Sequence, residues 1–471
     1  MISIKSIMSS SVEFDIETHV LQRYTGEARI QRLITAAYLD PELKEAALSL
    51  ALVDVKQQRN VLRFREIYRV ASTGTTGVCN LPAMDKDKWI AEAEDQNRLD
   101  RESLKAKLNT AQAHLNKEAI RSAFTALSEN LCTTGEMQEA FHAEMRAKDH
   151  CTTLQQTANH TTQSLALAIY ARNYETIPGM VFSLERSQRQ SAESHMAMAL
   201  ARLSQGSYEA AGDSFRAAAM SEFPPSEVST KWESAVLCPE DNAMYAAVLT
   251  LVARRDNAIA LAEHPSALET APILREILLH FHKHANYHEA SRLLESHVWP
   301  LLRHDPYFQA TSAPTGKTHM TEILETIRTK AIVEFWKPYS SCPLVSMQES
   351  LGETITGTIE ELKTTILDLL RNRLPSNTRF DMRTNTLVRD RVDQTPRESV
   401  SRNLQTSQMR ALDDTYSMMI RVACIDNESR FGDQKKRRQA WANRNDPSAT
   451  NDDVDDAMVV DTDAMNPEDL Y

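Results

Sequence analysis

Apolar side chains recur every three or four positions along most of this chain, which is the spacing of one buried face of an α-helix. The clearest stripe occupies residues 321–336, and Pro338 ends it shortly afterwards. A second stripe occupies residues 356–373, where Thr358 and Glu361 predict a capping box at the start of the helix. The last third of the chain is therefore predicted to hold two amphipathic helices.

The apolar pattern changes its period directly after these helices. Residues 378–382 and 386–390 predict two short strands, joined by a turn at 383–385. Two helices and a two-stranded wing form a winged-helix module. This fold binds DNA in some families and binds other proteins in different families. A mixed apolar pattern over residues 401–424 then predicts a C-terminal helix.

The middle of the chain repeats one short pattern, in which a turn residue is followed by small residues at helical spacing. The turn residues are Gly135, Asn173, Gly206 and Asn286, and the two glycines lie about 70 residues apart, or two units of roughly 35. The sequence therefore predicts an α-solenoid, in which each unit buries its apolar face against its neighbours. The unit that begins at Gly206 follows the tetratricopeptide scheme through Tyr208, Ala211, Phe215 and Ala218.

The composition agrees with an almost wholly helical protein, because 471 residues include only 11 glycines and 6% aromatic residues. The six cysteines form no C-x-x-C pair, which is typical of a reducing compartment and gives no zinc site. Residues 1–12 lack the apolar core of a secretory signal, and the best apolar run, 244–253, is too short to cross a bilayer. We expect a soluble intracellular protein with no membrane partner.

Breaks in these patterns divide the chain into six predicted regions. Pro224 and Pro225 interrupt the repeats, so residues 1–225 are expected to form an arm that can be removed without dissolving an assembly. A basic cluster at 435–438 precedes an acidic tail, whose composition predicts disorder. The regions are an N-terminal helical region (1–115), tetratricopeptide-like repeats (116–225), the helical part of a terminal domain (226–336), its winged helix (337–395), a C-terminal helix (396–430) and a disordered tail (431–471).

A helical-repeat array that ends in a winged helix resembles the PCI family, whose members are scaffold subunits of the proteasome lid, the COP-nine signalosome and a translation initiation complex. Segments of this chain narrow the resemblance to the family of signalosome subunit 1. Residues 24–33 are similar to its Y-T-G-x-x-R-I-x-R-L signature, and residues 147–152 to its A-R-D-Y-C-T segment. Residues 334–339 and 358–362 resemble the segments that open its winged helix and the helix that follows. The expected fold class is all-α with a small α/β end module.

This resemblance implies a non-catalytic scaffold subunit of the signalosome, a complex that removes a Nedd-type ubiquitin-like modifier from cullin-RING ubiquitin ligases. It implies that another subunit holds the catalytic metal, and that winged helices of neighbouring subunits join by strand addition while their terminal helices form a bundle. The implied partners are other PCI and isopeptidase subunits and cullin-RING ligases, in the nucleus and the cytoplasm. The residues expected to serve assembly are Thr378, Phe380, Leu387, Val388, Leu412 and Met419.

Two other functions fit parts of the sequence. A PCI subunit of the proteasome lid has the same architecture, although the segment at 24–33 argues against it. A winged-helix DNA-binding regulator would use residues 358–373 as its recognition helix. That helix nearly balances its basic and acidic residues, and the chain carries a net charge of -12, so nucleic acid is not an expected partner.

Other motifs in the chain carry no expected chemistry. Residues 313–318 resemble the end of a phosphate-binding loop, but Thr311 stands where that loop requires glycine. His280, His284 and His288 would share one helix face, yet no glutamate follows the first histidine as it does in a metalloprotease helix. We expect no catalytic residue, no metal site and no cofactor. Two interpretations of 435–438 stay open, a nuclear localisation signal and a solvated tail.

Overall fold

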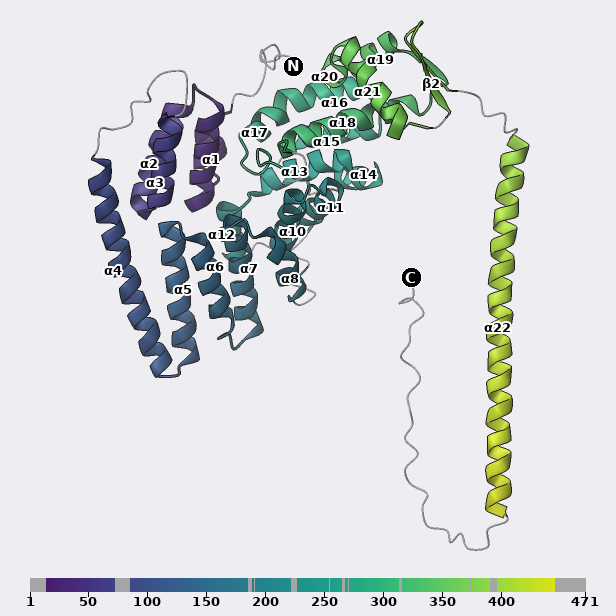
Figure 1. Cartoon of the computed structure of the whole chain (residues 1–471), viewed down its shortest axis with the longest axis horizontal. Helices are drawn as coiled ribbons and strands as arrows, with labels where there is room; N and C mark the ends of the chain where they lie inside the picture. Colours follow the sequence, from purple (N-terminus) through teal and green to yellow (C-terminus); the bar gives the residue numbers. More distant parts are fainter. Residues whose placement is uncertain are drawn as a thin grey trace. The chain divides into compact units, whose positions relative to one another are not determined.

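The computed structural model forms two compact units, Met1–Asp390 and Arg391–Tyr471. The first unit is a succession of antiparallel helices that ends in a small sheet, and the second contains one long helix (Figure 1). The predicted loop after residue 72, the Pro224-Pro225 break and the acidic tail lie outside the described residues. The structure describes residues 14–444 except for 73–84, 185–188, 190, 222–226, 254, 265–266, 270, 313–315, 373, 376 and 390–395.

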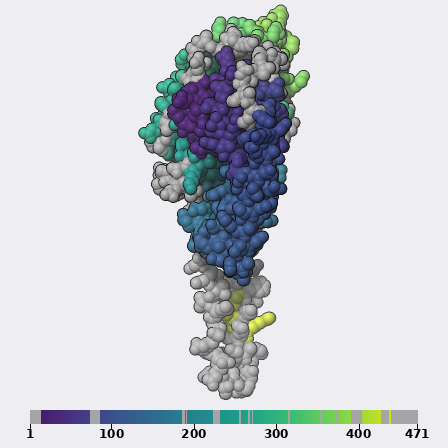
Figure 2. All heavy atoms as spheres, turned by 90° about the vertical axis from the view of Figure 1, so that its left-hand side faces the viewer, coloured from purple at the N-terminus to yellow at the C-terminus, as the bar shows by residue number. Residues whose placement is uncertain are grey.

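The N-terminal helices build a hydrophobic core of their own. A short π-helix, Glu17–Leu21, leads into three helices that pack on one another. Their shared core includes Ile30, Leu33, Leu48 and Phe64, each at most 1% exposed. Figure 2 faces this part of the molecule and shows the purple and blue N-terminal helices forming one continuous surface. The three helices are α1 (Gly26–Leu39), α2 (Lys44–Gln58) and α3 (Val61–Ser72).

The repeat region is an array of antiparallel helices, as predicted. Gly135 and Gly206 form the turns between paired helices with positive φ angles of 92° and 74°. A Cβ atom on Gly135 would lie 2.4 Å from the side chain of Asn60, so this turn also requires glycine for close packing against the N-terminal helices. The helices are α4 (Lys86–Ala113), α5 (Lys117–Thr134), α6 (Met137–Lys148), α7 (Leu154–Tyr170), η3 (Tyr174–Thr176), α8 (Ile177–Phe182), α10 (Ala192–Ser204), α11 (Tyr208–Ala219), α12 (Glu227–Ala235) and α13 (Pro239–Val252).

A single hydrophobic core joins the repeats to the helices that follow. Phe215, predicted to fill a groove between helices, is fully buried and meets the ring of Tyr245 at 5.3 Å. Leu99 on α4 is 54% exposed. Among the described residues, no helix is both long and apolar enough to cross a membrane. The following helices are α14 (Arg255–Glu263), α15 (Pro272–His282), α16 (Tyr287–Leu293), η4 (Leu294–Val298), α17 (Trp299–Arg303) and α18 (His319–Trp336).

The winged helix closes the first unit and contains one strand more than predicted. The predicted hairpin is present as β2 (Thr378–Asp381) and β3 (Thr386–Arg389). A third strand, β1 (Ser341–Pro343), pairs with β3, so the sheet order is β1-β3-β2. The predicted capping box is also present, since Thr358 Oγ1 accepts a hydrogen bond from the Glu361 amide at 3.3 Å and Glu361 accepts one in return. The helices are α19 (Leu344–Leu351), α20 (Glu353–Thr356) and α21 (Ile359–Asn372).

The second unit is one long helix, α22 (Pro396–Arg444). Its start agrees with the predicted boundary at 396, but it continues beyond the predicted end at 430 and includes the basic cluster 435–438. The sequence there is rich in lysine, arginine and glutamine, which are good helix formers, and the single glycine, Gly432, does not end the helix. The helix thus ends later than the apolar pattern alone indicated.

Candidate assembly surfaces

The two edges of the winged-helix sheet differ in their ability to accept another strand. The Arg389 amide donates to the Ser340 carbonyl at 2.8 Å, and the Leu344 amide donates to the Asn385 carbonyl at 3.0 Å. The amide and carbonyl groups of successive residues point to opposite edges of a strand. Those of Leu387 therefore point towards Cys342 of β1. Strand β3 is therefore the central strand, with paired neighbours on both sides.

The β1 edge is closed by a proline. Since Cys342 directs its backbone groups inward to β3, Ser341 and Pro343 direct theirs outward. Pro343 has no amide hydrogen to donate, so a further strand would find only the Ser341 donor along this three-residue edge. This edge is a poor template for strand addition.

The β2 edge is open. Strand β3 turns the backbone groups of Thr386 and Val388 towards β2, where Asp381 and Arg379 are their partners. Phe380 lies between those two partners and therefore directs its amide and carbonyl groups outward. Its side chain packs against the main hydrophobic core, which fixes the strand in place. The outer edge of β2 thus presents backbone hydrogen-bonding groups on a rigid support.

The structure brings only part of the expected assembly residues to a surface. Leu387 is fully buried, and Thr378 is 8% exposed and accepts a hydrogen bond from the Trp336 indole nitrogen at 3.4 Å. These two side chains support the winged helix from inside, because they lie on the sheet face that packs against the hydrophobic core. Phe380 and Val388 are half-buried on β2 and β3. Leu412 and Met419 are 58% and 68% exposed on α22.

Helix α22 exposes an unusual quantity of apolar side chains. Between residues 404 and 425, the charged positions 410, 413, 414 and 421 fall within a sector of about 100° when each residue advances by 100°. The apolar positions cover most of the remaining circumference, which is far wider than the stripe of a helix that packs on one neighbour. Large apolar side chains that are 53% to 70% exposed within this unit are Leu404, Met409, Leu412, Tyr416, Met418, Met419, Ile420, Val422 and Ile425.

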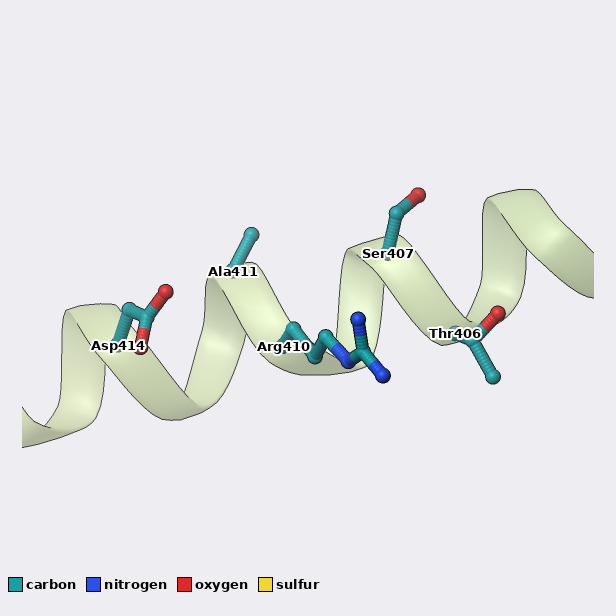
Figure 3. A pocket seen from close by; sticks show the side chains of 5 residues that line it. All are labelled: Thr406, Ser407, Arg410, Ala411 and Asp414. Atoms are coloured by element: carbon teal, nitrogen blue, oxygen red, sulfur yellow. The ribbon is translucent and has the colours of Figure 1, made fainter. Parts of the chain in front are cut away.

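The charged sector of α22 contains a shallow depression (Figure 3). Its lining residues come from the same few turns of this one helix, so the depression has no opposing wall. A small-molecule site normally buries most of its ligand between several elements, and this surface cannot do so. The lining residues are Thr406, Ser407, Arg410, Ala411 and Asp414.

A buried cluster of charges ties the N-terminal helices to α13 and to the loop after α17. The guanidinium of Arg32 lies 3.7 Å above the ring centre of Tyr24 and 3.5 Å from an oxygen of Asp305. The Tyr24 hydroxyl donates to Asp241 on α13. Beside the cluster, the imidazole of His304 lies 2.9 Å from an oxygen of Asp40. Arg32 and Asp305 are each 5% exposed, so this cluster belongs to the interior.

Burial and the neighbouring charges change the pKa of several groups in and beside this cluster. Burial by itself lowers the pKa of Arg32, but Tyr24, Asp305 and Asp241 outweigh it and raise that pKa above its usual value. Burial also raises the pKa of the Asp305 carboxyl, although Arg32 opposes the change. Burial raises the pKa of the Cys238 thiol to about 12, so this thiol is not a nucleophile at neutral pH. The cluster is thus a structural connection and not a reactive centre.

The cluster explains the segment at 24–33 that carried the family resemblance. Within this segment, Tyr24 and Arg32 make the contacts of the cluster. Arg29 forms an ion pair with Asp54 at 3.0 Å, and Gly26 begins α1 with a positive φ of 61°. Residues 1–225 are consequently in buried contact with the rest of the first unit, which argues against the expectation of a removable arm, and that expectation stays a prediction for the truncation experiment. No local pattern indicated this contact, because Tyr24 and Asp241 are 217 residues apart.

The remaining motifs have structural explanations. Lys317 pairs with Glu325 at 2.7 Å, while the Gly316 amide donates to the Ser312 carbonyl at 3.0 Å. His280 and His284 have ring centres 5.7 Å apart on one side of α15 and the turn after it. Within the described residues, no three histidine, cysteine or acidic side chains are placed to hold a metal ion.

A helical-repeat array that ends in a winged helix is similar in architecture to PCI-type proteins. The family described as 26S proteasome subunit RPN7 matches residues 86–256. Over about three quarters of its length, the chain is also similar to curated proteins named COP9 signalosome complex subunit 1, which confirms the resemblance found in the motifs.

The similarity to these relatives is low in identity but extends along most of each protein. Subunit 1b from Drosophila melanogaster is 22% identical, with 77% of each chain covered. Subunit 1 from Emericella nidulans is 25% identical, covering 76% of this chain and 72% of its own. Subunit 1 from Arabidopsis thaliana is 23% identical, covering 76% of this chain and 79% of its own.

Proposed function

We propose that this chain is a non-catalytic scaffold subunit of the COP9 signalosome, and that it assembles through the β2 edge and helix α22. The observation that carries this proposal is the exposed apolar surface of α22. An apolar surface of this extent on a single helix is normally a contact surface for a partner. The similarity to curated subunit 1 proteins supports the choice of complex.

In this proposal the chain is a structural support within a complex that removes a Nedd-type modifier from cullin-RING ubiquitin ligases. The chemistry belongs to another subunit, and the surface of the helical repeats meets further partners such as the ligases. The basic cluster at 435–438, of which Lys436 is exposed, serves nuclear import in the same proposal. The purified chain alone is expected to leave modified cullin intact, with or without added zinc.

A variant at the open sheet edge tests the assembly mode. Phe380→Pro removes the outward amide of β2 but leaves the hydrogen bonds between β2 and β3 in place. Phe380→Leu is the matched control, because it loses the aromatic ring and keeps the amide. We expect Phe380→Pro to stay folded by circular dichroism and to lose partner subunits in co-purification, while Phe380→Leu keeps them. Equal recovery of partners with both variants would contradict strand addition.

A PCI subunit of the proteasome lid is the second candidate, because the RPN7 family matches residues 86–256. Mass spectrometry of proteins that co-purify with the tagged chain separates the two candidates. Signalosome subunits are expected, and recovery of proteasome subunits instead would replace the proposal. A DNA-binding role has less support, since α21 begins with Glu360 and Glu361.

A further inference from the structure

A small hydrophobic core holds together one end of the helical repeats. Because α4 to α7 are antiparallel, the turn between α4 and α5 lies at the same end as the connection between α6 and α7 (Figure 1). The ring centre of Phe124 on α5 lies 6.0 Å from that of His150 in this connection. The core residues are Leu108, Ala111, Ile120, Phe124 and Ala147. We call this part of the array, residues 104–122, 142–156, 180–184 and Arg189, the basic end.

The basic end carries a net positive charge, in contrast to the net charge of -12 of the whole chain. One of its three acidic side chains, Glu144, is 2% exposed and lies 2.6 Å from the buried ring of His160, so it contributes little to the surface. Of the seven basic side chains, only Arg121 forms an ion pair with a described residue, Glu118 at 2.7 Å. The acidic residues are Glu118, Glu144 and Asp149, and the basic ones are Lys105, Lys107, Lys117, Arg121, Arg146, Lys148 and Arg189.

Large apolar side chains are exposed at the same end. Leu115, Leu154 and Phe182 are 83%, 66% and 64% exposed. The Lys148 ammonium donates to the Ser183 hydroxyl at 3.5 Å, which brings the end of α8 beside the end of α6. Apolar and cationic side chains therefore share one end of the array, and a partner that covers it has to match both.

Two positions at the basic end are unfavourable for the stability of the chain itself. Leu115 follows the end of α4 with a positive φ of 52°, where glycine or asparagine is the usual residue. Lys117 is the first residue of α5, where the helix dipole disfavours a positive charge. Both side chains are exposed, so internal packing does not explain them. Residues that cost stability and face water are typical of sites that serve a function.

We propose that the basic end binds an acidic segment of a partner protein, with apolar side chains of that segment against Leu115, Leu154 and Phe182. Charge complementarity favours an acidic partner. An anionic membrane has the same charge, but it is flat, and Lys107 and Lys105 lie about 9 and 12 Å back along α4 from its last residue. A protein segment can follow the sides of the helices and reach these lysines as well.

Binding of a designed peptide to the full-length chain tests the surface. The inference rests on the proposed role of the repeats in binding partners, but it concerns other residues than those proposed for subunit assembly, so no other subunit is needed. The probe is a short synthetic peptide of repeated Glu-Asp-Leu units, followed by fluorescence anisotropy. One comparison peptide replaces leucine by serine, and another replaces the acids by their amides. We expect the probe to bind at least about tenfold more tightly than either comparison peptide.

Charge reversal separates the basic end from the rest of the chain. Lys117→Glu, Lys148→Glu should weaken binding of the probe about tenfold. The matched control is Lys86→Glu, Lys88→Glu, which makes the same charge change at the other end of α4, and Lys86, like Lys117, is the first residue of its helix. We expect the control to bind like the unmodified chain. Equal affinity of the two double variants would overturn the proposal, as would no binding of the probe at about 1 mM.

Leu115→Asn removes an apolar contact and relieves the backbone at the same position. Asparagine tolerates a positive φ, so we expect Tm to stay the same or rise while binding of the probe weakens about fivefold. Unchanged binding by this variant would overturn the role of the apolar side chains. Vesicles that contain phosphatidylserine are the last comparison. Vesicle binding that Lys117→Glu, Lys148→Glu abolishes, together with no preference among the peptides, would assign the surface to a membrane and overturn an acidic protein partner.

Discussion

The charge cluster around Arg32 and the surface of α22 are opposite in character. At the cluster, the side chains of Arg32 and Asp305 are each only 5% exposed, although charged side chains normally face water. Along α22, methionine, leucine and isoleucine side chains that are normally buried are more than half exposed. The cluster is complete within one chain because each charge has a partner there. The helix surface is incomplete, since the described residues of its unit provide nothing to cover it.

This difference separates internal stability from assembly. Removing one partner from a buried ion pair leaves an uncompensated charge, so changes at the cluster should unfold the chain. Removing an exposed apolar side chain costs the isolated chain little and should affect only the complex. The two regions can therefore be distinguished by measuring folding and partner binding on the same variants.

The largest expected effect comes from a chain that begins at residue 226. It lacks Arg32 and Tyr24, so Asp241 and Asp305 lose their buried partners. We expect this fragment to be insoluble or largely unfolded by circular dichroism and gel filtration. A chain that ends at residue 395 is the control, because it removes only the second compact unit and should stay folded. A soluble, cooperative fold for the fragment from 226 would show that the cluster is dispensable.

A single substitution tests the same contact without truncation. Arg32→Leu leaves the buried carboxylate of Asp305 without its cation, while Asp241 keeps Arg23 at 3.3 Å, and we expect a loss of about 3–5 kcal/mol in the free energy of unfolding. Arg29→Leu on the same helix removes a pair with Asp54 that is partly open to solvent, so it should cost about 1 kcal/mol or less. Urea denaturation of both variants measures the difference. Equal losses would mean that burial of Arg32 has no special importance.

A charge on α22 should have the opposite outcome. Met419→Asp places a carboxylate within the apolar sector, and we expect the free energy of unfolding of the isolated chain to change by about 0.5 kcal/mol or less. Binding of partner subunits should weaken by about 2 kcal/mol or more, or roughly thirtyfold. Ser417→Asp on the charged sector is the control. If titration calorimetry gives the two variants the same affinity, the apolar sector is not the contact surface.

The smallest effect concerns a second buried cation. Lys330 donates to the Leu251 and Ala253 carbonyls at the end of α13, and burial lowers its pKa from 10.5 to about 8. Between those values the unfolded chain binds the proton more readily than the folded chain, so this residue makes stability increase as the pH rises. Lys330→Met should lack that increase in paired denaturation curves from pH 8 to pH 10.5. Parallel curves would contradict the lowered pKa.

Local patterns predicted those parts of the fold whose determinants lie close together in sequence. The capping box at Thr358, the turns at Gly135 and Gly206 and the β2–β3 hairpin each depend on a few neighbouring residues. Strand β1 was missed because three residues, one of them proline, give no period-two pattern.

Contacts between distant residues could not be predicted in this way. The cluster at Arg32 combines residues more than 200 positions apart, and no local pattern links them. The same limit affected the assembly residues: Leu387 has the alternation of a half-exposed strand, and only the packing of the sheet face against distant helices shows that its side chain is fully buried. The apolar residues of α22 were recognisable from sequence, but their arrangement as a broad sector required the full extent of the helix.

Pro343 also limits how many copies of this chain can join through their sheets. Growth of a sheet from chain to chain without end requires each copy to offer two receptive edges, one for the copy before it and one for the copy after it. Here Pro343 leaves one edge deficient in donors, while the opposite edge at Phe380 directs its backbone groups outward. Under the proposed strand addition, each chain therefore offers one receptive edge. In that case the proline gives the sheet a direction and opposes the growth of filaments through the β1 edge.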